Sequence, residues 1–305
     1  MADPSTSPTA PGGASTPAGA IHDIGYRHYD GPRLGTAYIR RSLFVDTLRG
    51  AFGLGRSARS KIMPFLLLGV LVLPAVVVGI VAAQFGFEEL PLDYEEYVVT
   101  QQVAVTVFLG SQCPAVMSRD LRFRIAPLYF SRPLSRQQYV QAKYAGTAAA
   151  LLVLIGLPLT LLLAGALLAE LPLSEQVGPY LRAMAGAVIH ALVLAGIGLV
   201  VAAMTPRRGI GVAAIVGVLL VSFGIQGTVQ ALAGELDDST LQGYSGLLSP
   251  YSLVDGVVSG VLGADSSYAE GPPGVLGTTV FVVVTVLLVA GCYAALVARY
   301  RKALA

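Results

Sequence analysis

The sequence predicts an all-α integral membrane protein with six transmembrane helices, and three observations support this fold class. Of its 305 residues, 54% are hydrophobic and 12% are charged, whereas a soluble domain carries about 25% charged residues. Six apolar segments approach or exceed the roughly 20 residues that a helix needs to cross a bilayer. Dividing the chain at these segments places all twenty Lys and Arg residues except Arg182 on one side of the membrane.

The first 61 residues divide into two regions. Residues 1–20 contain mainly Pro, Ser, Thr, Ala and Gly, so we expect a disordered tail and no signal peptide. Residues 21–61 are expected on the cytoplasmic side. The stretch GYRHYDGPR at 25–33 gathers a His, an Asp, two Tyr and two Arg, which makes it a candidate active site. Its Asp-Gly-Pro run is a turn signal, and we interpret it as the turn that leads into the next helix.

Residues 34–53 predict an amphipathic helix. Its apolar stripe contains Leu34, Ala37, Tyr38, Phe44, Val45, Leu48, Ala51 and Phe52. Its opposite face contains Thr36, Arg40, Asp46, Thr47 and Arg49. A basic amphipathic helix with aromatic residues favours a position in the headgroup plane of the membrane. The alternative is a helix that packs on another part of the protein.

The membrane domain is predicted over residues 62–302. Its six spans are expected at residues 62–83, 97–117, 144–168, 181–204, 209–233 and 274–297. The second of these spans is the most polar. A further apolar stretch at 250–263 is too short to span, so we expect a re-entrant or interfacial segment before the last span.

The distribution of charge orients these spans. Short cytoplasmic loops are enriched in Lys and Arg, so the side that carries them is the cytoplasm. Both termini are then cytoplasmic, and the protein is predicted to be a multi-pass protein of the plasma membrane. Arg182 alone among the basic residues falls on the opposite side.

The cytoplasmic loop between the second and third spans, residues 118–143, has the pattern of a contact surface. It alternates Arg with large apolar residues, and apolar anchors surrounded by Arg are typical of interfaces. Ser135 followed by Gln138 forms a capping-box pattern that predicts the start of the helix of the third span.

This arrangement resembles the permease of an ABC-2 type transporter. The resemblance rests on the order of six spans, the helix before the first, and the RPLSR motif at 132–136 followed by Lys143. Asp120 stands where the family usually has Glu. The stretch at 247–260 resembles the family's re-entrant helices, and GYRHYDGPRLG is similar to the opening of a permease subgroup common in actinobacteria.

The resemblance implies partners and roles. The chain would pair with a second permease, either another copy or a homologue, and with nucleotide-binding ATPase subunits that hold ATP and Mg. The 118–143 loop would be the coupling helix, and it would dock on the ATPase through Arg119, Asp120, Arg122, Phe123, Arg124, Tyr129, Phe130, Arg132 and Arg136. Residues 34–53 would be the connecting helix, with Tyr38, Arg40, Arg41, Val45, Leu48 and Arg49 as its contacts to the ATPase and to membrane lipids.

Polar residues inside the spans allow two interpretations. In the family, spans two and five flank the dimer interface and the translocation route, which implies such a role for Gln101, Phe108, Gln112, Ser222 and Gln226. The alternative is that these side chains form hydrogen bonds between helices. His190 lies near the middle of the fourth span, where an ionisable group is a functional candidate. The alternative is a neutral His bonded to a neighbouring helix.

Several kinds of chemistry have no motif in this chain. The Walker A, His-Glu-x-x-His and Gly-x-Ser-x-Gly patterns do not occur. Its three histidines are scattered, which argues against a zinc site. Cys113 and Cys292 lie in apolar runs, and we expect buried thiols. We therefore predict no catalytic residue, no metal and no cofactor in this chain, and no nucleic-acid partner.

The predicted function is that of a permease, with export as the expected direction, coupled to ATP hydrolysis by a separate subunit. The alternative is a membrane scaffold or sensor that transports nothing and recruits a cytoplasmic ATPase or another partner through the same loop. The sequence names no substrate.

Overall fold

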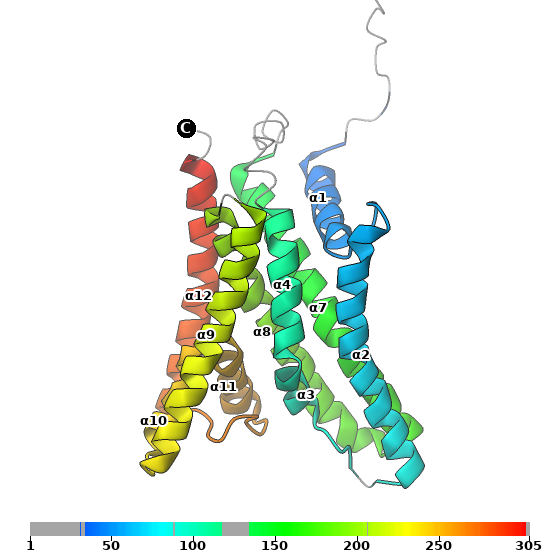
Figure 1. Cartoon of the computed structure of the whole chain (residues 1–305), viewed down its shortest axis with the longest axis vertical. Coiled ribbons are helices and arrows are strands. Elements are labelled where there is room, and N and C mark those ends of the chain that lie inside the picture. Colours follow the sequence, from blue (N-terminus) through cyan, green and yellow to red (C-terminus); the bar gives the residue numbers. More distant parts are fainter. Residues whose placement is uncertain (1–30, 32–33, 88, 118–133, 206, 303–305) are drawn as a thin grey trace, which may run out of the picture. The chain divides into compact units, whose positions relative to one another are not determined.

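The computed structural model describes residue 31 and residues 34–87, 89–117, 134–205 and 207–302. Residues Met1–Leu34 form one unit, of which only Gly31 and Leu34 are described, and Gly35–Ala305 form a second, compact unit. All regular elements in the described ranges are helices (Figure 1). The rest of this section concerns the second unit.

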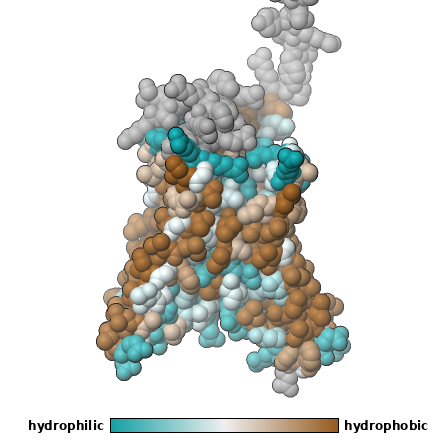
Figure 2. Space-filling model, viewed as in Figure 1, coloured by the Kyte–Doolittle hydropathy of each residue, from teal (hydrophilic) through white to brown (hydrophobic). Residues whose placement is uncertain are grey.

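Five helices of this unit are long and apolar enough to cross a membrane. They are α2 (Arg59–Phe85), α7 (Arg136–Leu168), α8 (Leu173–Met204), α9 (Arg208–Glu235) and α12 (Gly274–Lys302). They cover five of the six predicted spans, which confirms an all-helical integral membrane protein. Figure 2 shows hydrophobic residues across the middle of the visible face and hydrophilic residues towards its two ends, as a bilayer requires.

The second predicted span, 97–117, is divided. It contains α3 (Tyr94–Thr100) and α4 (Gln102–Val116), separated at Gln101. The break falls in the polar run Thr-Gln-Gln, where the Thr100 hydroxyl bonds the carbonyl oxygen of Tyr97. The carbonyl oxygen of Gln102 accepts a hydrogen bond from the Tyr251 hydroxyl at 3.0 Å. Such side-chain partners allow a helix to be interrupted inside a bundle.

The pair α3–α4 runs back along α2. The hydroxyl of Tyr97, in α3, donates to the carbonyl oxygen of Leu71 in the middle of α2. Farther along the chain, the ring of Phe108 lies 5.7 Å from that of Phe52, which precedes α2. The end of α4 therefore returns to the end of the bundle where α2 begins.

The predicted amphipathic helix is α1 (Thr36–Ala51), but its buried face differs from the predicted stripe. Leu43, Thr47 and Ala51 are buried, while Tyr38 is 54% exposed and Val45 is also exposed. The assignment of Thr47 to the opposite face was wrong. Because α1 packs on α7 at a glycine, a small side chain with a satisfied hydroxyl fits the contact better than a large apolar one. The Thr47 hydroxyl donates to the carbonyl oxygen of Leu43 at 2.7 Å.

The segment before the last span also forms helices. After α10 (Ser239–Tyr244) and a short 3-10 helix (Ser245–Leu248), α11 runs from Pro250 to Leu262. Ser249 caps its N-terminus and Gly263, in the left-handed region at φ 66°, ends it. The helix is buried from Tyr251 to Val258 and packs on α8 and α12. The apolar segment expected at 250–263 is therefore helical, and its re-entrant or interfacial position stays a prediction.

The centre of the bundle is α7, which packs against α1, α2 and α8, while α4 packs on α9. At Gly79 and Gly165 the backbones of α2 and α7 approach so closely that an added Cβ would overlap the opposite helix at 2.7 Å or less. Small residues of this kind allow close packing of membrane helices. Large apolar side chains on the outer faces of α2, α9 and α12 remain exposed, as for helices that contact lipid.

Candidate functional site

Most of the residues predicted to dock an ATPase lie outside the described ranges. They are Arg119, Asp120, Arg122, Phe123, Arg124, Tyr129, Phe130 and Arg132. The predicted turn at 25–33 and the tail at 1–20 also lie outside, except for Gly31. Arg136 is described, and its side chain is exposed at the first position of α7. The described residues at the two ends of the 118–133 segment, together with the end of α12, form a distinct cluster.

Both flanks of the 118–133 segment are firmly buried. Met117, which follows α4, is fully buried, and Leu134, which precedes α7, is 5% exposed. Next to Leu134, Ser135 accepts a hydrogen bond from the backbone N–H of Gln138, whose side chain accepts one from the N–H of Ser135. This capping box is the one that the sequence predicted.

Lys143 links the two flanks. Its side chain is 5% exposed, and its Nζ donates to the carbonyl oxygen of Val116 at 3.4 Å. The ammonium also lies 5.7 Å from the ring centroid of Tyr139. Such a bond satisfies a free carbonyl at the C-terminus of α4, where the helix dipole also favours a cation.

The C-terminal end of α12 completes this cluster. The Tyr300 hydroxyl contacts the sulfur of Met117 at 3.2 Å, and its ring lies 5.1 Å from that of Tyr139. Arg299 Nε donates to the carbonyl oxygen of Ala203 at the end of α8. We call Val116, Met117, Leu134, Tyr139, Lys143, Arg299 and Tyr300 the loop base. It joins α4, α7, α8 and α12, and it includes Met117 and Leu134, the described residues on either side of 118–133 in the sequence.

The helix α1 is seated beside the loop base. At Gly146 of α7 an added Cβ would lie 2.7 Å from Thr47 Cβ and 3.0 Å from the carbonyl oxygen of Phe44. The predicted contact residues of this helix have different environments. Leu48 packs partly against the core, whereas Tyr38, Arg40, Arg41, Val45 and Arg49 are exposed. Arg40 and Arg41 line an open groove of about 510 Å³ between α1 and α7.

The residues predicted for a translocation path or dimer interface lie on α4 and α9, which pack on each other, and at the break before α4. In α4, Phe108 is buried against Phe52, and Gln112 is buried with its Nε2 bonded to Ser111. Gln101 is half-buried at the break between α3 and α4. In α9, Ser222 bonds the carbonyl oxygen of Leu219 within its own helix. Gln226 lies near the far end of α9 and lines a polar pocket.

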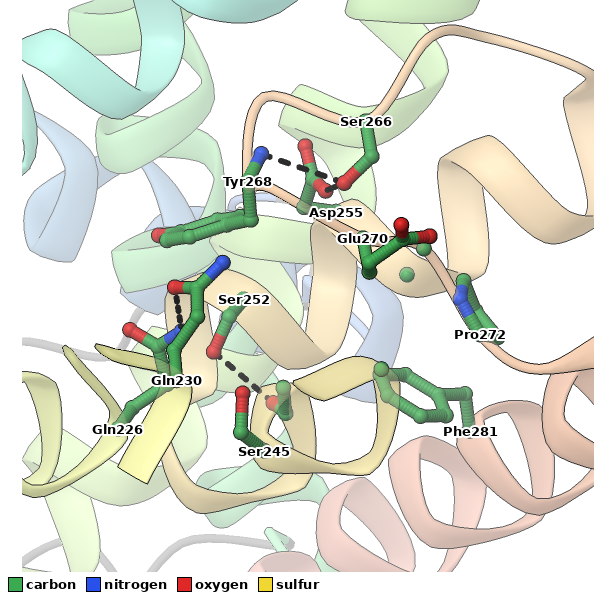
Figure 3. A pocket seen from close by; sticks show the side chains of 14 residues that line it. Gln226, Gln230, Ser245, Ser252, Asp255, Ser266, Tyr268, Glu270, Pro272 and Phe281 are labelled. Atoms are coloured by element: carbon green, nitrogen blue, oxygen red, sulfur yellow. Dashed lines mark hydrogen bonds between the residues drawn. The ribbon is translucent and has the colours of Figure 1, made fainter. Parts of the chain in front are cut away.

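This pocket lies among α9, α11 and the loop that follows α11 (Figure 3). Gln226 is 1% exposed, its Nε2 donates to Gln230 Oε1 at 2.7 Å, and its own Oε1 has no partner among the described residues. Asp255 of α11 accepts hydrogen bonds from the Ser266 hydroxyl at 2.7 Å and from the backbone N–H of Ser267 at 3.2 Å. Burial raises the pKa of the Asp255 carboxyl, and the bond from Ser266 partly opposes this effect.

The single basic residue predicted on the far side of the membrane also has a partner. Arg182 Nε lies 3.5 Å from Glu95 Oε1, so the pair joins α8 to α3. Close by, the Tyr94 hydroxyl donates to Gln176 Oε1 at 3.0 Å. These contacts explain how Arg182 can be an exception to the charge distribution.

His190 is buried in α8 at 4% exposure. Its Nδ1 lies 3.1 Å from the carbonyl oxygen of Gly186, one turn earlier in the same helix. Its Nε2 has no hydrogen-bond partner within the described residues. The bond to Gly186 lies within α8, and Tyr251 of the neighbouring helix α11 also approaches the ring, with ring centroids 5.8 Å apart. Both interpretations of His190 therefore stay predictions.

Sequence reasoning missed several of these residues. Tyr139, Tyr300 and Arg299 carry no motif, because an aromatic or basic residue at a span end has many ordinary explanations. Asp255 gave a usable signal, since an acid within an apolar stretch is a functional candidate. The prediction of two buried thiols was correct for Cys113 but wrong for Cys292, which is half-buried because α12 lies at the edge of the bundle.

Comparison with known families finds one match. A family described as "ABC-2 family transporter protein" matches residues 127–303, more than half of the chain. The matched region includes α7 to α12 and five of the seven loop-base residues, namely all except Val116 and Met117. A search of curated proteins finds no match.

Proposed function

Because the chain belongs to the ABC-2 family of transporter proteins and is thus a permease subunit of an ABC transporter, we propose that it is an exporter permease driven by a separate ATPase. ATP hydrolysis in that partner would move residues 118–133, and this movement would shift the transmembrane helices. A permease of this family works with ABC ATPase subunits, so the partner is required for active transport. Coupling needs two states of the bundle that differ in their contact energy with the motor.

One observation carries this proposal: the loop base connects the segment that would dock the ATPase to four helices at once. Lys143 holds α4 to α7, and Tyr300 and Arg299 bring in α12 and α8. A displacement of residues 118–133 would therefore act on a packed, hydrogen-bonded cluster. Because packed cores deform poorly and tend to switch between discrete arrangements, the bundle would respond as a unit.

The same proposal includes the topology. We propose that α3 and α4 together form the second of six spans, since the contacts of Tyr97 and Phe108 run back along α2. Both termini would then be cytoplasmic, in the plasma membrane. The apolar outer faces of α2, α9 and α12 would contact lipid or a second permease.

The docking proposal is tested by co-expressing this chain with candidate ABC ATPases from the same genome and co-purifying the one that binds it. Arg132→Glu combined with Arg136→Glu should reduce ATPase recovery about tenfold or more, because charge-assisted contacts would become repulsive. The matched control is Arg208→Glu, an exposed Arg at the start of α9 on the same predicted side but outside the loop.

Two outcomes would contradict the proposal in different ways. If the double variant binds the ATPase and stimulates its activity as wild type does, the 118–136 region does not dock it. If the ATPase binds but purified complexes in vesicles move none of a panel of lipids, drugs and peptides on addition of ATP, the scaffold or sensor alternative gains support.

A further inference from the structure

Two small cavities in the half of the bundle opposite the loop base share one residue, Asp255. The outer cavity is the polar pocket of Figure 3, about 10 Å³, whose lining includes Gln226, Tyr268 and the exposed Glu270. The inner cavity, about 20 Å³, lies among α3, α8 and α11 and is lined by Glu95, His190 and Asp255 together with apolar residues. A volume of roughly 10–15 Å³ holds one water molecule, so each cavity has room for about one.

Both cavities present polar atoms that lack a partner within the described residues. In the outer cavity these belong to Gln226 (Oε1) and Tyr268 (hydroxyl), and in the inner cavity to His190 (Nε2). Among the residues described, Glu95 Oε1, also in the inner cavity, has only its ion-pair contact with Arg182 Nε at 3.5 Å and no hydrogen bond. A buried polar atom without a partner costs free energy, and an internal water commonly supplies the missing bond. The Nδ1 of His190 must donate to the carbonyl oxygen of Gly186, because a carbonyl only accepts. The neutral ring therefore presents a lone pair at Nε2, which can accept a proton.

We propose that His190 is a proton-binding site, and that protons reach it from the α10–α11 end of the bundle through these two cavities by way of Asp255. Chains of Asp, Glu and His with intervening water are the usual proton relays of membrane proteins. This site is independent of the proposed ATPase coupling, since it lies on other residues at the opposite end of the bundle.

The proposed transfer conserves both atoms and charge. Protonated Asp255 gives its proton to the inner water while that water gives one of its own to the lone pair of His190 Nε2. The products are an imidazolium, still donating from Nδ1 to Gly186, and a carboxylate stabilised by Ser266 and Ser267. A hydronium ion that enters the outer cavity beside Glu270 then reprotonates Asp255. Because the pKa of Asp255 is raised, its carboxyl takes up a proton at a pH closer to neutral than an ordinary Asp carboxyl does.

The charged and titratable groups around the ring are known from every helix that packs on α8. From α3 come Glu95, which is paired with Arg182 of α8 itself, and Tyr94, which contacts Gln176 and Tyr180 nearer the start of α8. From α11 come Asp255 and Tyr251, whose ring lies 5.8 Å from that of His190. The other helices contact α8 farther along the chain. Tyr144 of α7 contacts Leu192, Cys292 of α12 lies at Gly196, and Cys113 of α4 lies at Gly198. In α9, Gln226 lines only the outer cavity. Two carboxyl groups and one guanidinium therefore surround the imidazole.

A competing ligand, a metal ion, does not fit these residues. Across the described ranges, no group of three His, Cys, Asp or Glu side chains lies close enough to hold a metal. The small volume of each cavity also excludes an organic ligand.

The test uses the full-length chain in lipid nanodiscs. Because the chain has three histidines, the changes His22→Gln and His28→Gln leave His190 as the only imidazole for ¹⁵N NMR. At about pH 8 we expect the neutral ring with its hydrogen on Nδ1, and on acidification to about pH 4 we expect the imidazolium. Failure of the ring to gain a proton over this range would overturn the proposal.

The route is tested in the same background by exchange of the ring N–H with solvent. Asp255→Asn keeps an oxygen that can accept from Ser266 and Ser267, and it should slow the exchange about tenfold or more. Asp255→Glu should restore it. Asp265→Asn, an exposed carboxyl in the same loop, is the matched control and should leave the exchange rate within about twofold. Equal exchange in Asp255→Asn and wild type would show that protons do not pass Asp255.

Discussion

At the scale of single residues, the proposed coupling depends most on Lys143. A buried ammonium is tolerated only where hydrogen bonds compensate its desolvation, and the carbonyl oxygen of Val116 supplies one such bond. The residue also contacts the ring of Tyr139. One side chain thus holds together the two helices that enter and leave the 118–133 segment.

We predict that Lys143→Met separates docking from coupling. Methionine fills a similar volume but loses a charge-assisted hydrogen bond worth roughly 1.5–3 kcal/mol, so α4 and α7 would no longer move together. Permease-dependent stimulation of the ATPase should fall about tenfold, while co-purification of the ATPase stays near the wild-type level. Lys61→Met, which removes an exposed lysine at the start of α2, is the control and should change neither. Wild-type stimulation in Lys143→Met would show that this bond does not transmit the movement.

At the scale of elements, the position of α1 is decided by its contact with α7. The contact occurs where Gly146 lies against Thr47, and an added Cβ would meet Thr47 at 2.7 Å. The docking of α1 on the bundle is a result of this close fit. The hydrophobic stripe predicted for α1 from its sequence would have placed a different set of residues against the bundle.

The matched substitutions Gly146→Ala and Gly217→Ala test this contact. Both exchange a helical glycine for alanine, a change that by itself favours the helix by roughly 1 kcal/mol. Gly217 of α9 has no atom within 4 Å of the added Cβ, so its variant should be as heat-stable as wild type or more so. Gly146→Ala should lower the thermal midpoint and increase proteolysis near α1. If the two variants behave alike in a thermal shift assay, the seating of α1 at Gly146 contributes little.

At the scale of the whole molecule, the question is whether the chain crosses the membrane five or six times. Five helices are long enough to cross by themselves, and α3–α4 would supply the sixth. Contacts at both ends of the bundle support the return of the chain through α3–α4: Phe52 with Phe108 at one end, and Glu95 with Arg182 at the other.

Cysteine labelling in intact cells distinguishes six spans from five. Single cysteines at Ser57, Gln137, Glu175 and Asp265 occupy exposed positions in four different connections or helix ends. With six spans, an impermeant maleimide should label Glu175→Cys and Asp265→Cys from outside, but Ser57→Cys and Gln137→Cys only after permeabilisation. The unsubstituted chain controls for reaction at Cys113 and Cys292. External labelling of Gln137→Cys together with protection of Ser57→Cys would exclude α3–α4 as a span.

The sequence alone was enough to predict where the long helices lie, the capping box at Ser135, and an apolar segment at 250–263 that is too short to span. These features depend on local composition compared with the thickness of a bilayer and the geometry of a helix start, so they can be read without knowledge of neighbours. The family resemblance was also present in the order of these elements.

How the helices meet could be learned only from the folded structure. The bond from Lys143 to Val116, the inward position of Thr47 and the two cavities at Asp255 all join residues far apart in the chain. Lipid is as apolar as the side chains it surrounds, so hydrophobicity does not select one helix pairing over another. That selection comes from close packing at small residues and from hydrogen bonds between helices, which depend on three-dimensional fit and leave no periodic pattern in the sequence.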